Sequence, residues 1–143
     1  MDRPSGVSIR PYAAGDLHGV KALWEEVFPH DPPWNRAEIA IPAKLGVQPD
    51  LLLVAEVAGQ IVGTAMAGYD GHRGWLYSVA VKPDRQGQGI GRMLVQDAER
   101  RLTDLGCRKI NLQVRSGNEV VGFYRTLGYD VEDRISLGKR TGE

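Results

Sequence analysis

The residues best suited to chemistry in this sequence form a glycine-rich turn near its centre. The segment 86–91 reads Gln-Gly-Gln-Gly-Ile-Gly, with Arg85 before it and Arg92 after it. Glycine carries no Cβ, so a ligand can approach the backbone of such a turn closely. If a helix begins at Ile90, its first turn adds unpaired N–H groups and partial positive charge. This combination predicts a binding site for a phosphate or pyrophosphate group.

The spacing of the glycines narrows the class of phosphate ligand. A dinucleotide-binding turn of the Gly-x-Gly-x-x-Gly kind would need a third glycine at the position that Arg92 occupies. A P-loop would need Lys and then Ser or Thr after the glycines, and no Lys follows here. A domain that binds ATP or NAD is therefore disfavoured. A loop that only turns the chain remains an alternative.

The hydrophobic pattern predicts the elements that position this turn. Apolar residues at helical spacing predict a helix after an N-cap at Asp16, and a strong helix that begins at Ile90 and ends before Gly106. Alternating patterns and the turn pair Ala58-Gly59 predict an antiparallel meander in the middle of the chain. The full set comprises strands at 7–10, 51–57, 60–69, 75–81, 109–114 and 129–137, and helices at 17–27, 36–45, 90–105 and 118–127. This order predicts an α/β or α+β fold with a mixed sheet and helices on both faces.

Length and composition set further limits. With 143 residues the chain fits a single domain, 1–143. Its formal net charge of zero gives no long-range attraction to nucleic acid or to an anionic membrane. The one cysteine, Cys107, excludes a disulfide within the chain and suits a small buried spacer. No signal peptide, bilayer-length apolar run or metal-ligand spacing is visible, so we expect a cytoplasmic protein without a metal.

The turn and its surroundings resemble the GNAT superfamily of N-acetyltransferases. The Gln-x-x-Gly-x-Gly spacing at 86–91 matches the superfamily's Q/R-x-x-G-x-G/A motif, and the flanking segments 79–83 and 93–95 match as well. A second block, Phe-Tyr-Arg-Thr-Leu-Gly-Tyr at 123–129, is similar to the superfamily's F-Y-x-x-x-G-F/Y segment. Within the superfamily, the segments 33–35, 69–74 and 136–140 resemble the YpeA branch.

The resemblance implies acetyl-CoA as the co-substrate and a way to hold it. In the GNAT fold the strand before the glycine-rich turn splays from the next strand, here 110–114, within a mostly antiparallel central sheet. Pantetheine fits into the split and bonds backbone groups that correspond to those of Val79 and Val81, while the turn binds the pyrophosphate. The donor-binding residues implied in this way are Val79, Ala80, Val81, Gln86, Gly87, Gln88, Gly89, Ile90, Gly91, Arg92 and Asn118.

Tyr124 corresponds to the family's tyrosine that protonates the departing thiolate after an amine attacks the thioester directly. A phenol with a pKa near 10 can donate to a thiolate without a special environment. The alternative is that Tyr124 only packs its helix against the sheet. One spacing departs from the family, since Asn118 precedes Tyr124 by six positions rather than the usual seven. Ser116 or Gly117 could therefore take the place of the asparagine.

The acceptor, which the resemblance implies is an amine of a small molecule or peptide, is the part that the sequence defines least. Candidate substrate contacts are Trp34, Asp70, His72 and Tyr77. Trp34 could equally fill the core, and the segment that holds Asp70 and His72 also suits a tight exposed hairpin.

The sequence leaves the general base and the oligomeric state open. Glu56 could act as a base or could face solvent, and Tyr77 or Ser78 could anchor a water chain instead. A domain that only senses acetyl-CoA remains the alternative to an enzyme. A homodimer could form if the last predicted strand, at 131–137, pairs across an interface.

Overall fold

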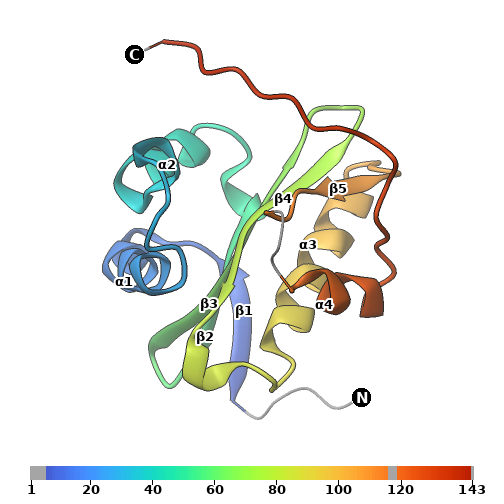
Figure 1. Cartoon of the computed structure of the whole chain (residues 1–143). Helices are drawn as coiled ribbons and strands as arrows, with labels where there is room; N and C mark the ends of the chain where they lie inside the picture. Colours follow the sequence, from blue (N-terminus) through green and yellow to red (C-terminus); the bar gives the residue numbers. More distant parts are fainter. Residues whose placement is uncertain (1–5, 116–118, 143) are drawn as a thin grey trace. The chain divides into compact units, whose positions relative to one another are not determined.

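The sheet and the C-terminus belong to separate parts of the structure. The computed structural model describes residues 6–115 and 119–142 (Figure 1). The chain divides into two compact units, residues 1–113 and residues 114–143. We call them the sheet unit and the C-terminal unit.

Within residues 6–115 and 119–142 the sheet has five strands in chain order, with β1 and β5 at its edges. The strands are β1 (Val7–Pro11), β2 (Leu52–Val57), β3 (Gln60–Tyr69), β4 (Gly74–Val81) and β5 (Ile110–Leu112). Neighbours from β1 to β4 pair antiparallel, and β5 pairs parallel with β4. The β2–β3 connection is tight because Ala58 and Gly59 both have positive φ, at 50° and 79°, as a two-residue hairpin turn requires. The predicted mixed, mostly antiparallel sheet is confirmed.

Helices cover both faces of the sheet. The sheet unit contains α1 (Leu17–Val27), α2 (Ala37–Leu45) and α3 (Ile90–Asp104). α1 and α2 lie on one side of the sheet, and α3 lies on the other (Figure 1). Adjacent residues of β3 show both packings, since Thr64 accepts a hydrogen bond from Trp24 of α1, whereas a Cβ at Gly63 would lie 2.8 Å from Leu94 of α3. Successive strand residues face opposite sides, so the central strand is buried on both.

The end of α3 follows the sequence prediction. Gly106 has a φ of 97°, its N–H donates to the carbonyl of Thr103 at 2.9 Å, and the N–H of Cys107 donates to that of Leu102 at 3.0 Å. This pair of bonds is a Schellman motif, which uses a glycine to satisfy the last carbonyls of a helix. The thiol of Cys107 is buried and donates to the carbonyl of Lys109 at 3.3 Å. The predicted role as a buried spacer fits this position.

The C-terminal unit contains a short helix, α4 (Val121–Thr126), and then an extended segment. The predicted last strand at 129–137 is wrong, because the described residues after Gly128 form no strand. An alternating pattern favours an extended backbone, but a strand also needs a hydrogen-bonded neighbour. Here the N–H of Arg134 donates to the carbonyl of Glu132 at 2.9 Å, which closes a three-residue turn. Ile135 and Leu137 are 89% and 92% exposed. The homodimer that depended on this strand stays a prediction.

Two further elements are clearly shorter than predicted, whereas the bounds of the remaining strands and helices differ from the predicted ones by at most one residue. β5 ends at Leu112 rather than at Val114. The predicted helix at 118–127 is shortened to Val121–Thr126, and its first residue, Asn118, lies outside the described residues.

Asp16 joins β1, β2 and the start of α1. It precedes α1 as predicted, but its side chain makes no capping hydrogen bond to that helix. The carboxylate instead accepts two hydrogen bonds from the guanidinium of Arg10, at 2.7 and 2.9 Å, and one from the N–H of Ala13, at 2.8 Å. Arg10 also donates to Glu56 of β2 at 3.2 Å. The hydrogen bonds from Arg10 hold the pKa of the Asp16 carboxyl below its ordinary value, although burial opposes them.

We expect Asp16→Asn to lower the free energy of unfolding by about 2 kcal/mol at pH 7, because it breaks a largely buried, charge-assisted pair. The folded-state pKa of Asp16 is depressed. Its contribution is therefore present above the unfolded-state pKa of about 3.9 and is lost as the pH falls through the folded value. Urea unfolding of both proteins at pH 7 and near pH 3 measures this.

The matched control is Glu25→Gln, which removes the exposed ion pair between Lys21 and Glu25. Such a pair contributes about 0.5 kcal/mol or less. Equal losses in the two variants at pH 7, or a loss at Asp16 that does not shrink in acid, would contradict a stabilising role for the Asp16 network.

Candidate functional site

The candidate site begins at one edge of β4. This strand pairs with β3 from Gly74 to Val81, but it pairs with β5 only at Gly74, Trp75 and Leu76. On the side of β5, the stretch Tyr77–Val81 pairs with no strand among the described residues. We call this side of Tyr77–Val81 the open edge. An extended ligand can hydrogen-bond to the backbone groups of this edge as a neighbouring strand would. The predicted splay of β4 and β5 is confirmed.

A β-bulge lies in the middle of the open edge. Thr64 pairs with Ala80 and Met66 pairs with Tyr77, so Ser78 and Val79 together oppose a single residue of β3. Ser78 has a φ of 50°, a left-handed conformation that is uncommon for a residue with a Cβ. A bulge of this kind bends a strand and redirects its backbone groups, and bulges are frequent beside active sites.

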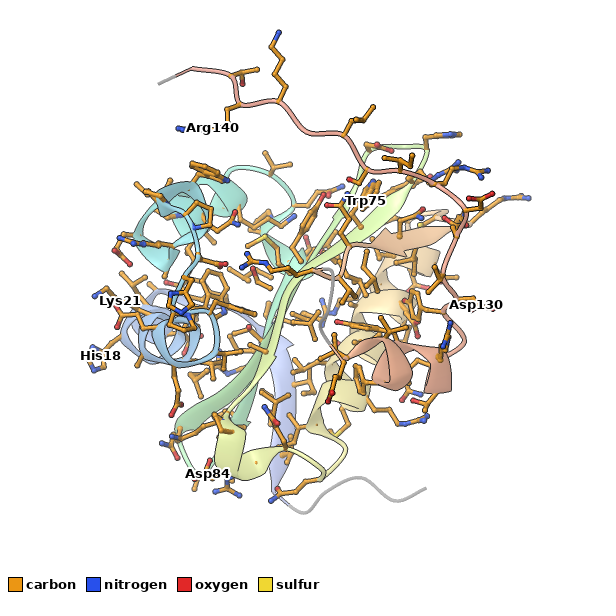
Figure 2. All side chains as sticks on the ribbon, viewed as in Figure 1. His18, Lys21, Trp75, Asp84, Asp130 and Arg140 are labelled. Atoms are coloured by element: carbon orange, nitrogen blue, oxygen red, sulfur yellow. The ribbon has the colours of Figure 1, made fainter. Side chains whose placement is uncertain are left out.

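The glycine-rich turn continues directly from the end of the open edge. Lys82 still bonds β3 through its N–H, which donates to the carbonyl of Val62 at 2.8 Å, and a 3-10 turn follows at Pro83–Arg85. Asp84, in this turn, is labelled in Figure 2. The side-chain amide of Gln86 donates back to the carbonyl of Val81 at 3.2 Å. The turn is thus fastened to the strand that precedes it.

The turn presents the start of α3 to a ligand. Gly87 and Gly89 have φ values of 79° and 86°, which a residue with a Cβ adopts only with strain. The first bond of the helix runs from the N–H of Met93 to the carbonyl of Gly89, at 3.0 Å. No side-chain cap and no acidic residue of the first turn competes for the earlier N–H groups. Arg85 and Arg92 flank the turn in sequence, so this helix start is suited to an anion.

Tyr124 is fixed by the way α4 ends. The N–H of Gly128 donates to the carbonyl of Arg125 and that of Tyr129 donates to the carbonyl of Tyr124, both at 3.1 Å. This is a second Schellman motif, with Gly128 at a φ of 95°. The ring of Tyr124 packs edge-on against those of Phe123 and Tyr129, with centroids 5.0 and 5.8 Å away. The spacing of the aromatic residues and the glycine in the segment 123–129 is therefore explained by the ring contacts and by the end of the helix.

Burial raises the pKa of Tyr124 to about 12. This differs from the ordinary phenol value on which the sequence argument relied. The phenol is fully protonated at neutral pH and is a weaker acid than expected. It remains a good hydrogen-bond donor.

Three of the predicted acceptor contacts belong to the β3–β4 hairpin, with Asp70 and His72 in its turn and Tyr77 on β4. Oδ1 of Asp70 accepts the N–H groups of His72 and Arg73, at 2.7 and 2.8 Å. These bonds lower the pKa of Asp70 and show that it organises the turn. Partial burial, and to a lesser extent the charge of Asp70, raises the pKa of Tyr77, whose side chain is 49% exposed. Tyr77 thus combines an apolar ring and a hydroxyl at the open edge.

The surroundings of Trp34 and Glu56 bear on the alternatives that the sequence left open for them. Trp34 lies in the 3-10 turn Pro33–Asn35 and is 47% exposed, so the alternative that it fills the core is wrong. Glu56 accepts a hydrogen bond from Arg10 at 3.2 Å, so its carboxylate is engaged within the ion-pair network. Asn118, Ser116 and Gly117 lie outside the described residues.

Sequence reasoning missed two buried residues behind the open edge, Trp24 and Thr64. The indole N–H of Trp24 donates to the hydroxyl of Thr64, and that hydroxyl donates to the carbonyl of Ser78, each at 2.8 Å. A threonine within a strand and a tryptophan within a helix give no signal of such a contact. Only the fold brings them to the bulge.

Neither a metal-ligand cluster nor a membrane-spanning helix is present among the described residues. The described His, Cys, Asp and Glu side chains form no group of three or more that could hold a metal ion. Among the described helices, none combines the length and the apolar content needed to cross a bilayer.

Comparisons with known proteins agree with this architecture. A family model described as the acetyltransferase (GNAT) family matches residues 17–129. An acetyltransferase of Pectobacterium atrosepticum is 47% identical over 135 residues, which cover 94% of this chain and 95% of that one. An uncharacterized N-acetyltransferase of Yersinia pestis is 44% identical over 135 residues with the same coverage, 94% and 95%.

A solved structure supports the fold alone. AAC(6')-Iy in complex with the bisubstrate analogue CoA-S-monomethyl-acetylneamine superposes with a TM-score of 0.77. It is 21% identical, and the match covers 96% of this chain and 100% of that one.

The raised pKa of Tyr124 can be measured directly. NMR titration of protein carrying ring-labelled tyrosine, with Tyr124→Phe to assign the signal, should show this phenol ionising near pH 12, because burial disfavours the phenolate. An ionisation at or below the ordinary value of about 10 would contradict the buried environment.

Proposed function

This chain belongs to the acetyltransferase (GNAT) family, and from that premise we propose that it transfers an acetyl group from acetyl-CoA to a primary amine of a small molecule or peptide. The observation that carries the proposal is the continuity of the open edge, the glycine-rich turn and the start of α3. These lie on one stretch of chain, from Tyr77 to Arg92. A thioester donor with a pyrophosphate needs a strand edge for its extended arm and, next to it, an anion site for its pyrophosphate.

The open edge is suited to the pantetheine arm. Pantetheine is extended and carries two amides, so it can pair with backbone groups of Val79 and Val81 as a strand would. The β4–β5 pairing ends early, after Leu76 and Leu112, and this supports the proposal because the next residues of β4 have no strand partner on that side among the described residues. Gln86, whose side chain bonds the carbonyl of Val81 at 3.2 Å, would join this arm to the turn.

The turn and the start of α3 are suited to the pyrophosphate. The N–H groups of residues 86–91 would donate to its oxygens, and Arg92 would add positive charge. A Cβ at Gly87 would meet no protein atom within 4 Å. The positive φ of Gly87 already favours glycine, and the open space beside its Cα leaves room for a closely approaching ligand.

The reaction transfers an acyl group without a covalent enzyme intermediate. The neutral amine attacks the thioester carbonyl, the C–S bond breaks, and the amine loses the proton that the departing thiolate gains. We assign Tyr124 as the group that donates to the sulfur. Its pKa of about 12 keeps the phenol protonated. An ordinary thiol, with a pKa of about 8.5, is the stronger acid, so the phenol proton stays on Tyr124 and is not transferred permanently to the thiolate. Tyr124 therefore stabilises the leaving group chiefly as a hydrogen-bond donor.

The acceptor contacts that we propose are Trp34 and Tyr77, with Asp70 and His72 as secondary candidates. Both aromatic side chains are about half exposed, at 47% and 49%, and can therefore meet a ligand. Asp70 already bonds two N–H groups of its own turn, which limits what it offers to an amine.

We expect Gly87→Ala to weaken acetyl-CoA binding about tenfold or more, because the new methyl group would stand where the pyrophosphate approaches. Calorimetry with acetyl-CoA, ATP and NAD measures the affinity, and only acetyl-CoA should bind well. The matched control is Gly59→Ala. Gly59 has the same φ of 79° and also faces open space, but it lies in the β2–β3 turn.

Both glycine variants should lose similar folding stability, so a difference in affinity isolates the ligand contact. Equal affinities in Gly87→Ala and Gly59→Ala would remove the turn from the binding site. Tight binding of ATP or NAD would instead favour the nucleotide-binding alternative.

We expect Tyr124→Phe to lower turnover about 100-fold while the acetyl-CoA dissociation constant changes less than about twofold. A thiol-release assay against a panel of amines, amino acids and peptides gives the rate. Tyr12→Phe serves as control, because Tyr12 packs against the core on the side of α1. Binding of acetyl-CoA without thiol release for any amine would favour the sensor alternative.

A further inference from the structure

We propose that the buried chain of hydrogen bonds from Trp24 through Thr64 to the carbonyl of Ser78 is a positioning device for acyl transfer. It sets the plane of the Ser78–Val79 peptide and thereby aims the N–H of Val79 at the thioester carbonyl of the bound donor. The inference rests on the proposed function. It adds two positioning residues, neither of which touches the substrate.

The direction of each hydrogen bond in this chain is fixed by chemistry. The indole N–H of Trp24 can only donate, so the hydroxyl of Thr64 accepts there, at 2.8 Å. A carbonyl can only accept, so the single hydroxyl proton of Thr64 points to the oxygen of Ser78, also at 2.8 Å. Trp24 and Thr64 are buried. No rotation of the hydroxyl can satisfy both partners in another way.

The hydroxyl of Thr64 is placed in an otherwise apolar part of the core. The cluster on this side of the sheet consists of Val20, Leu23, Trp24, Ala37, Ile41, Leu52, Val54 and Ala80, with Ile61 and Met66 against it. Burying a hydroxyl among such groups is unfavourable unless it is hydrogen-bonded. A valine would fill the same volume without that requirement. The hydroxyl is therefore explained by what it binds.

What it binds is the strained residue of β4. Ser78 has a φ of 50°, and such a conformation persists only where the surroundings determine it. Ser78 and Val79 share one position opposite β3. Tyr77 therefore pairs with Met66, and Ala80 pairs with Thr64. Met66 and Thr64 both lie on the α1 side of the sheet. The bond from Thr64 holds the carbonyl of Ser78 toward that side.

The opposite end of the same peptide is the N–H of Val79, a residue of the open edge. The described part of the chain contains no cis peptide bonds, and in a trans peptide the C=O and the following N–H point in opposite directions. With the carbonyl of Ser78 held by Thr64, the N–H of Val79 points away from Thr64. Val79 lies within Tyr77–Val81, the part of β4 without a strand partner on the side of β5 among the described residues.

A backbone N–H held in this way is what a thioester carbonyl requires as the amine attacks. Negative charge develops on the carbonyl oxygen, and a donor that is already oriented stabilises it without reorganisation. If the peptide could rotate, part of that stabilisation would be lost while pantetheine and pyrophosphate contacts remained. The device should therefore act on the rate of acyl transfer more than on donor affinity.

The test compares Thr64→Val, which removes the hydroxyl but keeps the shape, with Thr64→Ser, which keeps the hydroxyl. Thr64→Val should lower kcat about 10- to 100-fold with the acetyl-CoA dissociation constant changed less than about threefold. Thr64→Ser should restore kcat to within about threefold of the unmodified protein. Trp24→Phe keeps the bond from Thr64 to Ser78 and should have an effect between these two.

A second readout does not depend on turnover. The infrared band of the carbonyl of bound [1-13C]acetyl-CoA should shift to lower frequency in the unmodified protein, because a directed donor weakens the C=O bond. The shift should be lost in Thr64→Val and recovered in Thr64→Ser. This separates the two proposals, since the shift can be present even if no amine acceptor is turned over and the enzyme assignment fails.

The control for a mere loss of stability is Val54→Ala. Val54 is buried and lies opposite Thr64 in the sheet register, but it makes no bond to the bulge through its side chain. This variant should keep both kcat and the carbonyl shift. Thr64→Ala replaces Thr64→Val if the latter does not fold. Normal kcat and a normal carbonyl shift in a folded variant without the hydroxyl would overturn the inference, as would a loss in Thr64→Ser equal to that in Thr64→Val.

Discussion

The rest of the site depends on the early end of the pairing between β4 and β5. The two parallel strands share only three registered pairs, the last of them Leu76 with Leu112. β4 itself continues to Val81 while it is held on its other side by β3. A strand that is paired along one edge and unpaired along part of the other has free backbone N–H and C=O groups, to which a ligand can hydrogen-bond. The proposed donor site thus relies on the same hydrogen-bonding capacity that builds the sheet.

The features that distinguish this edge from an ordinary strand edge lie on the edge itself, on the residues that follow it in sequence, or in the core directly behind it. The bulge at Ser78 and Val79 redirects a peptide, and the buried hydroxyl of Thr64 holds it. The side chain of Gln86 ties the glycine-rich turn back to the strand. The close approach of α3 to β3, where a Cβ at Gly63 would lie 2.8 Å from Leu94, fixes the start of the helix relative to the strand. Strand, bulge, turn and helix are therefore connected parts of one frame, which we propose receives an extended donor.

The sequence predicts the local parts of this account and not the tertiary ones. The start of α3 and the glycines at positive φ follow from spacing and residue type, as does the end of that helix at Gly106. The bulge has no signal, because Ser78 is an ordinary strand residue until its partner strand is known. The predicted strand at 129–137 failed for the opposite reason, since its pattern is correct but no neighbour pairs with it. Burial likewise set the pKa of Tyr124 to about 12, which no spacing reveals.

The central claim is that acetyl-CoA lies along the open edge of β4 and ends at the glycine-rich turn. Amide chemical shifts recorded by NMR while acetyl-CoA is added to the full chain test it most directly. The largest changes should fall on residues 77–81 and 86–92, with the N–H of Val79 among the strongest. Changes confined to other parts of the sheet unit, with residues 77–92 unaffected at saturation, would contradict it.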